Sequence, residues 1–177
     1  MTEQINPVRD GIIAAVLCLL MALVFCAAPA RAAGSPDALI FDIYTRAQGT
    51  AGGDFIYAQP KDRPKYLSKS LVALWAKAEA LAEEGYAGPI EFDPITNSQD
   101  PRVYGFGVKV ERQDETRATV SAIFAERPGS YLAAPKQTIY FDLVREDGAW
   151  KIDDIRGQAR SRPVEWSLRK LLADFKG

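Results

Sequence analysis

Apolar positions at helical spacing predict three helices, at 35–49, 65–85 and 163–177. The first helix has Ser35 as its cap and Pro36 in its first turn, where a missing N–H costs no hydrogen bond. The second is rich in alanine and leucine and is expected to end at Gly85. The positions expected to be buried are Leu39, Ile40, Ile43, Tyr44 and Ala47, then Leu67, Leu71, Leu74, Trp75, Ala78 and Leu81, and finally Trp166, Leu168, Leu171, Leu172 and Phe175.

After the second helix the pattern changes to alternation, which is typical of strands. Four alternating stretches are found at 102–111, 116–126, 137–146 and 148–157. The polar stretch RQDE joins the first pair and Asp147-Gly148, a strong turn pair, joins the second, so we expect two hairpins. Helices followed by antiparallel strands favour an α+β fold, with N-terminal helices packed on a curved four-stranded sheet and a closing C-terminal helix. The stretch 48–64, rich in glycine and proline, is expected to be a loop with at most one short turn.

The first 32 residues carry the features of an export signal. Residues 12–28 form an uninterrupted apolar run, and Ala30-Arg31-Ala32 then fits the small-x-small pattern that signal peptidase cleaves. We expect cleavage after Ala32, a single mature domain at 33–177 and a periplasmic location. The run is longer than a usual signal core and slightly shorter than a usual membrane span, so an uncleaved N-terminal anchor stays open as the alternative. No later run is apolar enough to cross a bilayer.

The composition excludes several classes of chemistry. The sequence has no histidine, and both of its cysteines, Cys18 and Cys26, lie within the N-terminal apolar run. Catalysis by Ser-His-Asp or Cys-His sets and ordinary zinc sites are therefore excluded, and the mature domain has no disulfide. With 22 basic and 23 acidic side chains, the chain also lacks the excess positive charge of a nucleic-acid binder. We expect no cofactor and no bound metal.

A polar stretch before the first strand, FDPITNSQDP at 92–101, is the best candidate for a binding site. The candidate residues, including an aromatic residue that follows the stretch, are Asp93, Asn97, Gln99, Asp100 and Tyr104. One interpretation is that the Asx side chains tie the loop by capping backbone N–H groups. Another is that these side chains form a polar rim presented to a ligand or partner. A calcium site is the third interpretation, although the spacing and the glycine of an EF-hand loop are missing.

Two carboxylates are candidates for an enzymatic role. In a regularly alternating strand Asp154 shares a face with Trp150 and Ile152, so it either points into an apolar interior or pairs with an arginine at the sheet edge. An inward carboxylate has a raised pKa and could act as a general base, with a tyrosine as the acid. Asp93 is the second candidate for this role. The enzymatic alternative requires an open cavity, not an interior filled by Trp75, Phe106 and Trp150.

Three stretches together resemble a known group of proteins. The stretch GAWKIDDIRG at 148–157 resembles the last strand of the cystatin-like, nuclear-transport-factor-two-like superfamily. With FDPITNSQD at 92–100 and WSLRKLL at 166–172, it is similar to a family of small exported bacterial domains of unknown function within that superfamily. The resemblance covers roughly residues 35–175. It implies a cone built from a sheet and helices and an exported location, and it implies no activity.

These observations favour a periplasmic binding or accessory domain over an enzyme. The expected partner is another periplasmic or envelope protein, or a small ligand held in the cone, and an inhibitor-like or immunity-like role falls within this class. No nucleic acid is expected, and a membrane would be contacted through an uncleaved N-terminal segment alone. A small isomerase or hydrolase that uses Asp154 or Asp93 is the alternative.

Overall fold

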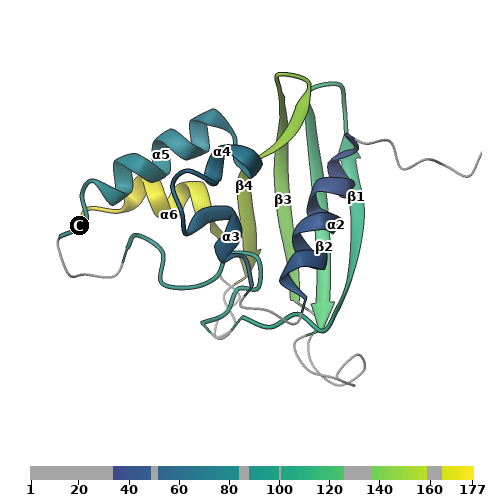
Figure 1. Ribbon diagram of the computed structural model, residues 1–177, viewed down its shortest axis with the longest axis horizontal. Helices are drawn as coiled ribbons and strands as arrows, with labels where there is room; N and C mark the ends of the chain where they lie inside the picture. Colours follow the sequence, from purple (N-terminus) through teal and green to yellow (C-terminus); the bar gives the residue numbers. More distant parts are fainter. Residues whose placement is uncertain (1–33, 49–51, 84–87, 100, 126–136, 159–164) are drawn as a thin grey trace, which may run out of the picture. The chain divides into compact units, whose positions relative to one another are not determined.

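Five antiparallel strands form one open sheet in the order β1-β2-β3-β4-β5 (Figure 1). The structure is a computed structural model that describes residues 34–48, 52–83, 88–99, 101–125, 137–158 and 165–177. The strands are β1 Gly105–Gln113, β2 Arg117–Ala125, β3 Gln137–Glu146, β4 Ala149–Gln158 and β5 Glu165–Ser167. The helices are α2 Pro36–Ala47, α3 Asp54–Tyr57, α4 Arg63–Tyr66, α5 Lys69–Glu79 and α6 Leu168–Asp174. The predicted α+β class is confirmed, while the export segment predicted at 1–32 lies outside the described residues.

Both predicted hairpins are present. Strand β1 pairs with β2, β2 with β3 and β3 with β4, so the four long strands form a meander. Asp147 and Gly148 connect β3 to β4 with φ angles of 50° and 81°, the left-handed backbone that a two-residue hairpin turn requires. In the other hairpin turn, Asp114 Oδ1 accepts hydrogen bonds from the N–H groups of Thr116 and Arg117 at 2.8 and 2.7 Å.

Helix α2 and the inner face of the sheet enclose the main apolar core. Alternate residues of β2 are buried there, namely Ala118, Val120, Ala122 and Phe124. Tyr44 of α2 is fully buried among aromatic rings, with centroid distances of 5.6 Å to Phe106, 5.8 Å to Phe124 and 6.1 Å to Phe141. Its hydroxyl donates to the Ile95 carbonyl at 2.6 Å, which satisfies the polar end of the buried side chain.

Helix α5 is shorter than predicted. It spans Lys69–Glu79 instead of 65–85, and Leu81 is 48% exposed instead of buried. Trp75 and Ala78 are the last buried positions of its apolar stripe. Leu81 beyond them is largely exposed, and the high helix propensity of alanine does not by itself extend a helix in water.

The predicted C-terminal helix is divided into a strand and a helix. Residues Glu165–Ser167 pair with β4 as the short strand β5, and α6 begins only at Leu168, so the sheet has five strands instead of the predicted four. The indole ring of Trp166 packs against Gly157 of β4, where an added Cβ would lie 2.9 Å from the ring. The glycine therefore leaves the space that the indole occupies, and this close contact accompanies the pairing of β5 with β4.

The stretch predicted as a loop at 48–64 contains the short helix α3 and the start of the short helix α4. Both pack against side chains of α5. The Arg63 guanidinium donates to both carboxylate oxygens of Glu79, at 2.7 and 2.5 Å, and lies 4.8 Å from the ring centroid of Trp75. The Trp75 ring in turn stacks on Tyr57 at a centroid distance of 5.6 Å. Tertiary packing thus orders a segment whose composition favours irregular structure.

Candidate functional site

Asp93 of the predicted binding loop is buried, with 5% of its surface exposed. Its Oδ1 accepts hydrogen bonds from the Tyr57 hydroxyl at 2.9 Å and from the Ile95 N–H at 3.1 Å. Its Oδ2 accepts from the Thr96 hydroxyl at 2.8 Å and from the Gly53 N–H at 3.2 Å. These four donors occupy the carboxylate, which therefore ties the loop to α3 and is not presented at a rim.

Burial around Asp93 raises the pKa of this carboxyl group and of the neighbouring tyrosines Tyr44 and Tyr57. It raises the pKa of Asp93 above the ordinary value, although the hydrogen bonds to the carboxylate act in the opposite direction. Burial and the nearby Asp93 charge also raise the pKa of Tyr57 above its ordinary value. Tyr57 therefore stays protonated and remains a hydrogen-bond donor. This geometry supports the interpretation that the Asx side chains hold the loop in place.

The other candidate residues of the loop do not converge on one site. Asn97 has a left-handed backbone with φ of 51°, and its Nδ2 donates to the Gln158 carbonyl at 2.6 Å, which ties the loop to the end of β4. Gln99 is exposed, and Tyr104 is 37% exposed. Asp100 lies outside the described residues. Of the predicted rim residues that the structure describes, Gln99 and Tyr104 are the exposed ones.

A bulge in β4 determines where Asp154 points. The register of β4 against β3 shifts at Asp153, which is an extra residue in the ladder. The buried positions of the strand are consequently Ile152 and then Ile155, and Asp154 is half-buried off the inner face. Of the two orientations left open for Asp154, the inward one is therefore not found, because the extra residue reverses the alternation.

Asp154 binds the start of helix α6. Its Oδ1 accepts hydrogen bonds from the N–H groups of Arg169 and Ile155, both at 2.9 Å, and its Oδ2 accepts from the Ser167 hydroxyl at 2.6 Å. Burial raises the pKa of Asp154 above its ordinary value, while these hydrogen bonds act to lower it. The first N–H groups of a helix lack partners within the helix, so a carboxylate acceptor there stabilises it. Helix capping thus explains the position of Asp154 without an enzymatic role.

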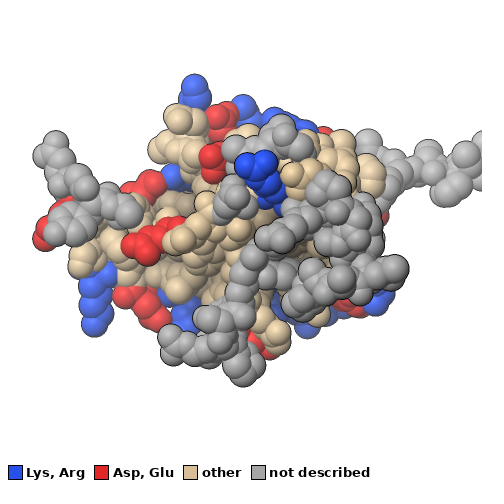
Figure 2. Space-filling view, turned by 90° about the horizontal axis from the view of Figure 1, so that it is seen from below, with Lys and Arg blue, Asp and Glu red and all other residues tan. Residues whose placement is uncertain are grey.

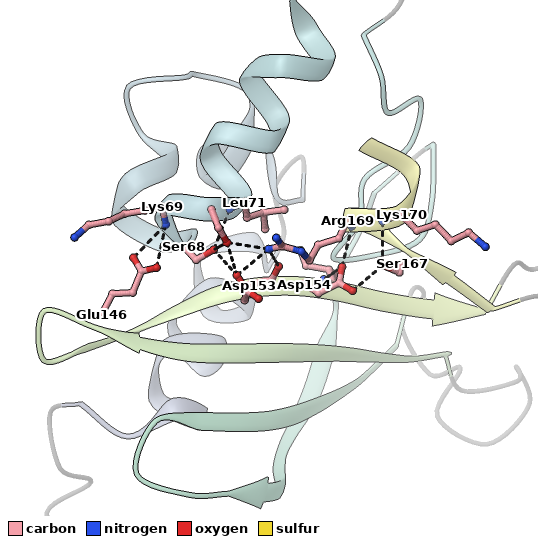
Figure 3. A network of polar contacts seen from close by, with 11 residues as sticks. Ser68, Lys69, Leu71, Glu146, Asp153, Asp154, Ser167, Arg169 and Lys170 are labelled. Carbon is pink, nitrogen blue, oxygen red and sulfur yellow. Dashed lines mark hydrogen bonds and ion pairs between the residues drawn. The ribbon is translucent and has the colours of Figure 1, made fainter. Parts of the chain in front are cut away.

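Asp153 binds the start of helix α5 (Figure 3). Its Oδ1 accepts hydrogen bonds from the hydroxyls of Ser68 and Ser70 at 2.6 and 2.9 Å and from the Arg169 guanidinium at 2.8 Å. Ser68 is the N-cap of α5, and its Oγ accepts from the Leu71 N–H at 3.0 Å. The first turns of α5 and α6 therefore meet over two neighbouring aspartates of one strand (Figure 3).

An open groove of about 480 Å³ lies beside α5, between α4 and the turn that joins β3 to β4. Its apolar lining residues are Pro64, Leu67, Val72, Ala73, Ala76 and Ala149. Val72, Ala73 and Ala76 fall on one side of α5 at helical spacing, and the small alanine side chains leave the space open. The sequence pattern did not predict this groove. The available signal was a pair of alanines off the buried stripe of the helix.

The charged residues at the groove are paired with neighbouring groups. Lys69 Nζ lies 2.8 Å from Asp147 Oδ2, and this hydrogen-bonded ion pair raises the pKa of Lys69 and lowers that of Asp147. Lys151 Nζ donates to the carbonyl oxygens of Pro64 and Lys65, both at 2.8 Å. Charges of both signs thus flank an apolar surface, and the groove is suited to an apolar group without a strong charge.

The described ranges give no sign of a metal site, and the face shown in Figure 2 gives none of a nucleic-acid site. No cluster of acidic, histidine or cysteine side chains in these ranges could hold a metal ion. None of the described helices combines the length and apolar character needed to span a membrane. On the face shown in Figure 2, basic and acidic side chains are interspersed with neutral ones. The coloured residues of that face form no extended basic surface.

Comparisons with protein-family models, with curated proteins and with solved structures found no match. The fold and the contacts described above are therefore the basis for assigning a function.

Proposed function

We propose that the chain is exported to the periplasm and that its folded part is a binding or accessory domain. The apolar run at 12–28, followed by Ala30-Arg31-Ala32, supports export. The order of helices, antiparallel meander and short C-terminal helix supports membership of the family of small exported domains in the cystatin-like, nuclear-transport-factor-two-like superfamily. A cone formed by the sheet and its helices is part of this proposal.

The observation that carries the binding function is the groove beside α5. Its volume of about 480 Å³ falls within the range of about 300–1,000 Å³ found for small-molecule sites. Its lining is largely apolar with a few polar groups at the edge, which is also typical of such sites. The occupant we propose is the apolar part of a small ligand, or apolar side chains of an envelope protein. An inhibitor-like or immunity-like role would add contacts at the exposed Gln99 and Tyr104.

The enzymatic alternative has less support. A general base needs a lone pair directed at substrate, whereas Asp93 and Asp154 accept four and three hydrogen bonds within the protein. Trp75 and Trp150 are buried and fill the interior, while Phe106 is half-buried and packs against Tyr44. We therefore favour binding over catalysis.

Titration with anilinonaphthalene sulfonate, an anionic dye with a large apolar aromatic part, tests the groove. The protein is purified from the cell envelope as it occurs there, and N-terminal sequencing reports whether it begins at Met1 or Ala33. Saturable binding of one dye per chain is expected, with the affinity reduced at least about tenfold in Ala76→Arg, because the long side chain fills the groove. Ala73→Arg should have the same effect.

The matched control is Ala173→Arg, which places the same side chain on an exposed position of α6 that does not line the groove. This variant is expected to bind the dye like the unaltered protein. Equal loss of binding in the variants of both helices, or recovery of the chain from the cytosol, would contradict the proposal.

A further inference from the structure

Strand β1 forms a free edge of the sheet (Figure 1). Within the described ranges β2 is its one strand neighbour, and the edge of β1 that faces away from β2 pairs with no other strand. The edge of β4 differs, because β5 pairs with its last residues and the Ser68 N–H donates to the Ile152 carbonyl at 2.8 Å. A free edge presents backbone N–H and C=O groups with which an extended chain can pair.

The open part of this edge is short and is bounded on both sides. Before it, Gln48 forms an isolated bridge to Val103. After it, the register against β2 shifts between Val110 and Arg112. The stretch in between, 105–110, contains no proline and no charged side chain on its inner face, two features that commonly block strand addition.

Apolar surface lies beside the open edge on the inner face. Phe106, Val108 and Val110 are only partly buried there. Phe41 of α2 is 42% exposed, and its ring contacts Phe106 edge to face at a centroid distance of 5.2 Å. Since side chains of an added strand alternate between faces, every second one would cover this surface.

The outer face of the same edge is open and carries one exposed basic side chain. Gly105 and Gly107 have no side chains, and a Cβ added to Gly107 would have nothing within 4 Å. Lys109 follows, with a side chain that is 73% exposed and that pairs with Glu111 of the same strand at 2.8 Å. Such an exposed ion pair contributes little to stability, so Lys109 can readily exchange the Glu111 carboxylate for that of a partner.

We propose that β1 binds an extended segment of a partner protein, in which apolar residues alternate with acidic ones. The segment adds a sixth strand beside 105–110, its apolar residues cover Phe41, Phe106 and Val108, and an acidic residue pairs with Lys109. This proposal rests on the proposed binding function, but it uses a surface formed by α2 and β1, whereas the groove is formed by α4, α5 and the turn between β3 and β4.

The synthetic peptides TEVEVEVTS and TKVKVKVTS test the proposal by calorimetry and by amide hydrogen exchange of the unmodified full chain. The acidic peptide is expected to bind and to slow exchange within 105–110. Opposite charges across neighbouring strands stabilise the pair, so Lys109→Glu should weaken the acidic peptide about two- to fivefold and favour the basic one by a similar factor. Phe41→Ser should weaken the acidic peptide at least about threefold.

Leu81→Ser is the matched control, because Leu81 is 48% exposed and lies after α5, outside the sheet. It should leave the affinity unchanged, as should Ala76→Arg, so that failure of the edge and failure of the groove are distinguishable. Loss of peptide binding in Ala76→Arg would place the peptide in the groove and overturn the proposal. So would equal binding of both peptides, absence of binding, or protection of 105–110 that rises with protein concentration alone, which would indicate a second copy at the edge.

Discussion

The Tyr57 hydroxyl lies 2.9 Å from Asp93 Oδ1, so a residue of α3 donates to a buried carboxylate 36 positions later in the chain. The Gly53 N–H adds a second bond from the same region. Ile95, two residues after Asp93, is fully buried, and its carbonyl accepts from Tyr44. The loop is therefore packed into the core, and we expect changes at Asp93 to affect stability before they affect binding.

Asp93→Asn is expected to lower the free energy of unfolding by about 1–3 kcal/mol, because a buried donor is left without an acceptor. One carboxylate oxygen accepts from the Ile95 N–H and the other from the Gly53 N–H. Either orientation of the amide therefore directs its NH₂ group at a backbone N–H. Urea unfolding measures the change, and the exposed Gln99→Ala should stay within about 0.5 kcal/mol of the unaltered protein.

The pH dependence of stability should differ in sign between Asp93 and Asp142. Burial raises the pKa of Asp93, so the folded state binds this proton more tightly than the unfolded chain, whose ordinary value is 3.8. Its contribution to stability is fully present below that value and is lost as the pH rises through the folded pKa. The stability of the protein relative to Asp93→Asn should thus fall as the pH rises from about 3 to 6.

Asp142 should show the opposite trend. Burial acts to raise its pKa, but hydrogen bonds from Arg156 and Thr119 and the nearby guanidinium charges outweigh burial, and the net pKa is lowered. Its contribution is present above the unfolded value and is lost as the pH falls through the folded pKa. The stability of the protein relative to Asp142→Asn should rise with pH up to about the unfolded pKa of 3.8 and change little above it. Carboxyl NMR titration that gives both midpoints on the same side of 3.8 would contradict this assignment.

Gly52→Ala should be strongly destabilising. Gly52 has φ of 77°, and an added Cβ would overlap Asp93 Oδ2 and lie 2.5 Å from Pro101 Cβ. Alanine at such a φ costs more than about 1 kcal/mol before the overlap is counted. Gly88→Ala is the control, because a Cβ there has nothing within 4 Å, and its effect should stay within about 0.5 kcal/mol. Thermal unfolding of the two variants compares them directly.

Asp154→Ala should loosen helix α6. The change removes the acceptor of the Arg169 N–H and of the Ser167 hydroxyl, and loss of such a cap costs about 0.5–2 kcal/mol. Hydrogen exchange of the amides of α6 is expected to quicken more than that of α2. Asp174→Ala, at the exposed end of the same helix, should leave the exchange of Arg169 unchanged. An identical exchange pattern in both variants would show that Asp154 has no capping role.

Local patterns predicted the central elements of the fold well. Strand β3 occupies the predicted residues, because Gln137–Glu146 alternates without interruption. The Asp147-Gly148 turn has the left-handed backbone that its sequence favours. Helix α2 follows the predicted apolar face, with Ile40, Ile43 and Tyr44 fully buried.

The parts that were missed depend on contacts between distant segments. Trp166 fits a helical apolar stripe, yet it lies in a strand because Gly157 of β4 leaves room for its ring. Asp93 reads as a polar loop residue, and nothing next to it in sequence indicates that Tyr57 and Gly53 will surround it. The groove beside α5 is likewise formed by α4, α5 and the turn after β3, which no local pattern connects.

Because β4 has a single extra residue, this one strand positions α5, α6 and the end of the sheet. With strict alternation, Asp153 and Asp154 would point to opposite faces of the sheet. Either Ile155 would then leave the apolar interior, or α5 or α6 would lose the aspartate that binds its first turn. Deletion of Asp153 should consequently displace α5, α6 and the end of the sheet in one cooperative step, since the bulge at this residue positions all three.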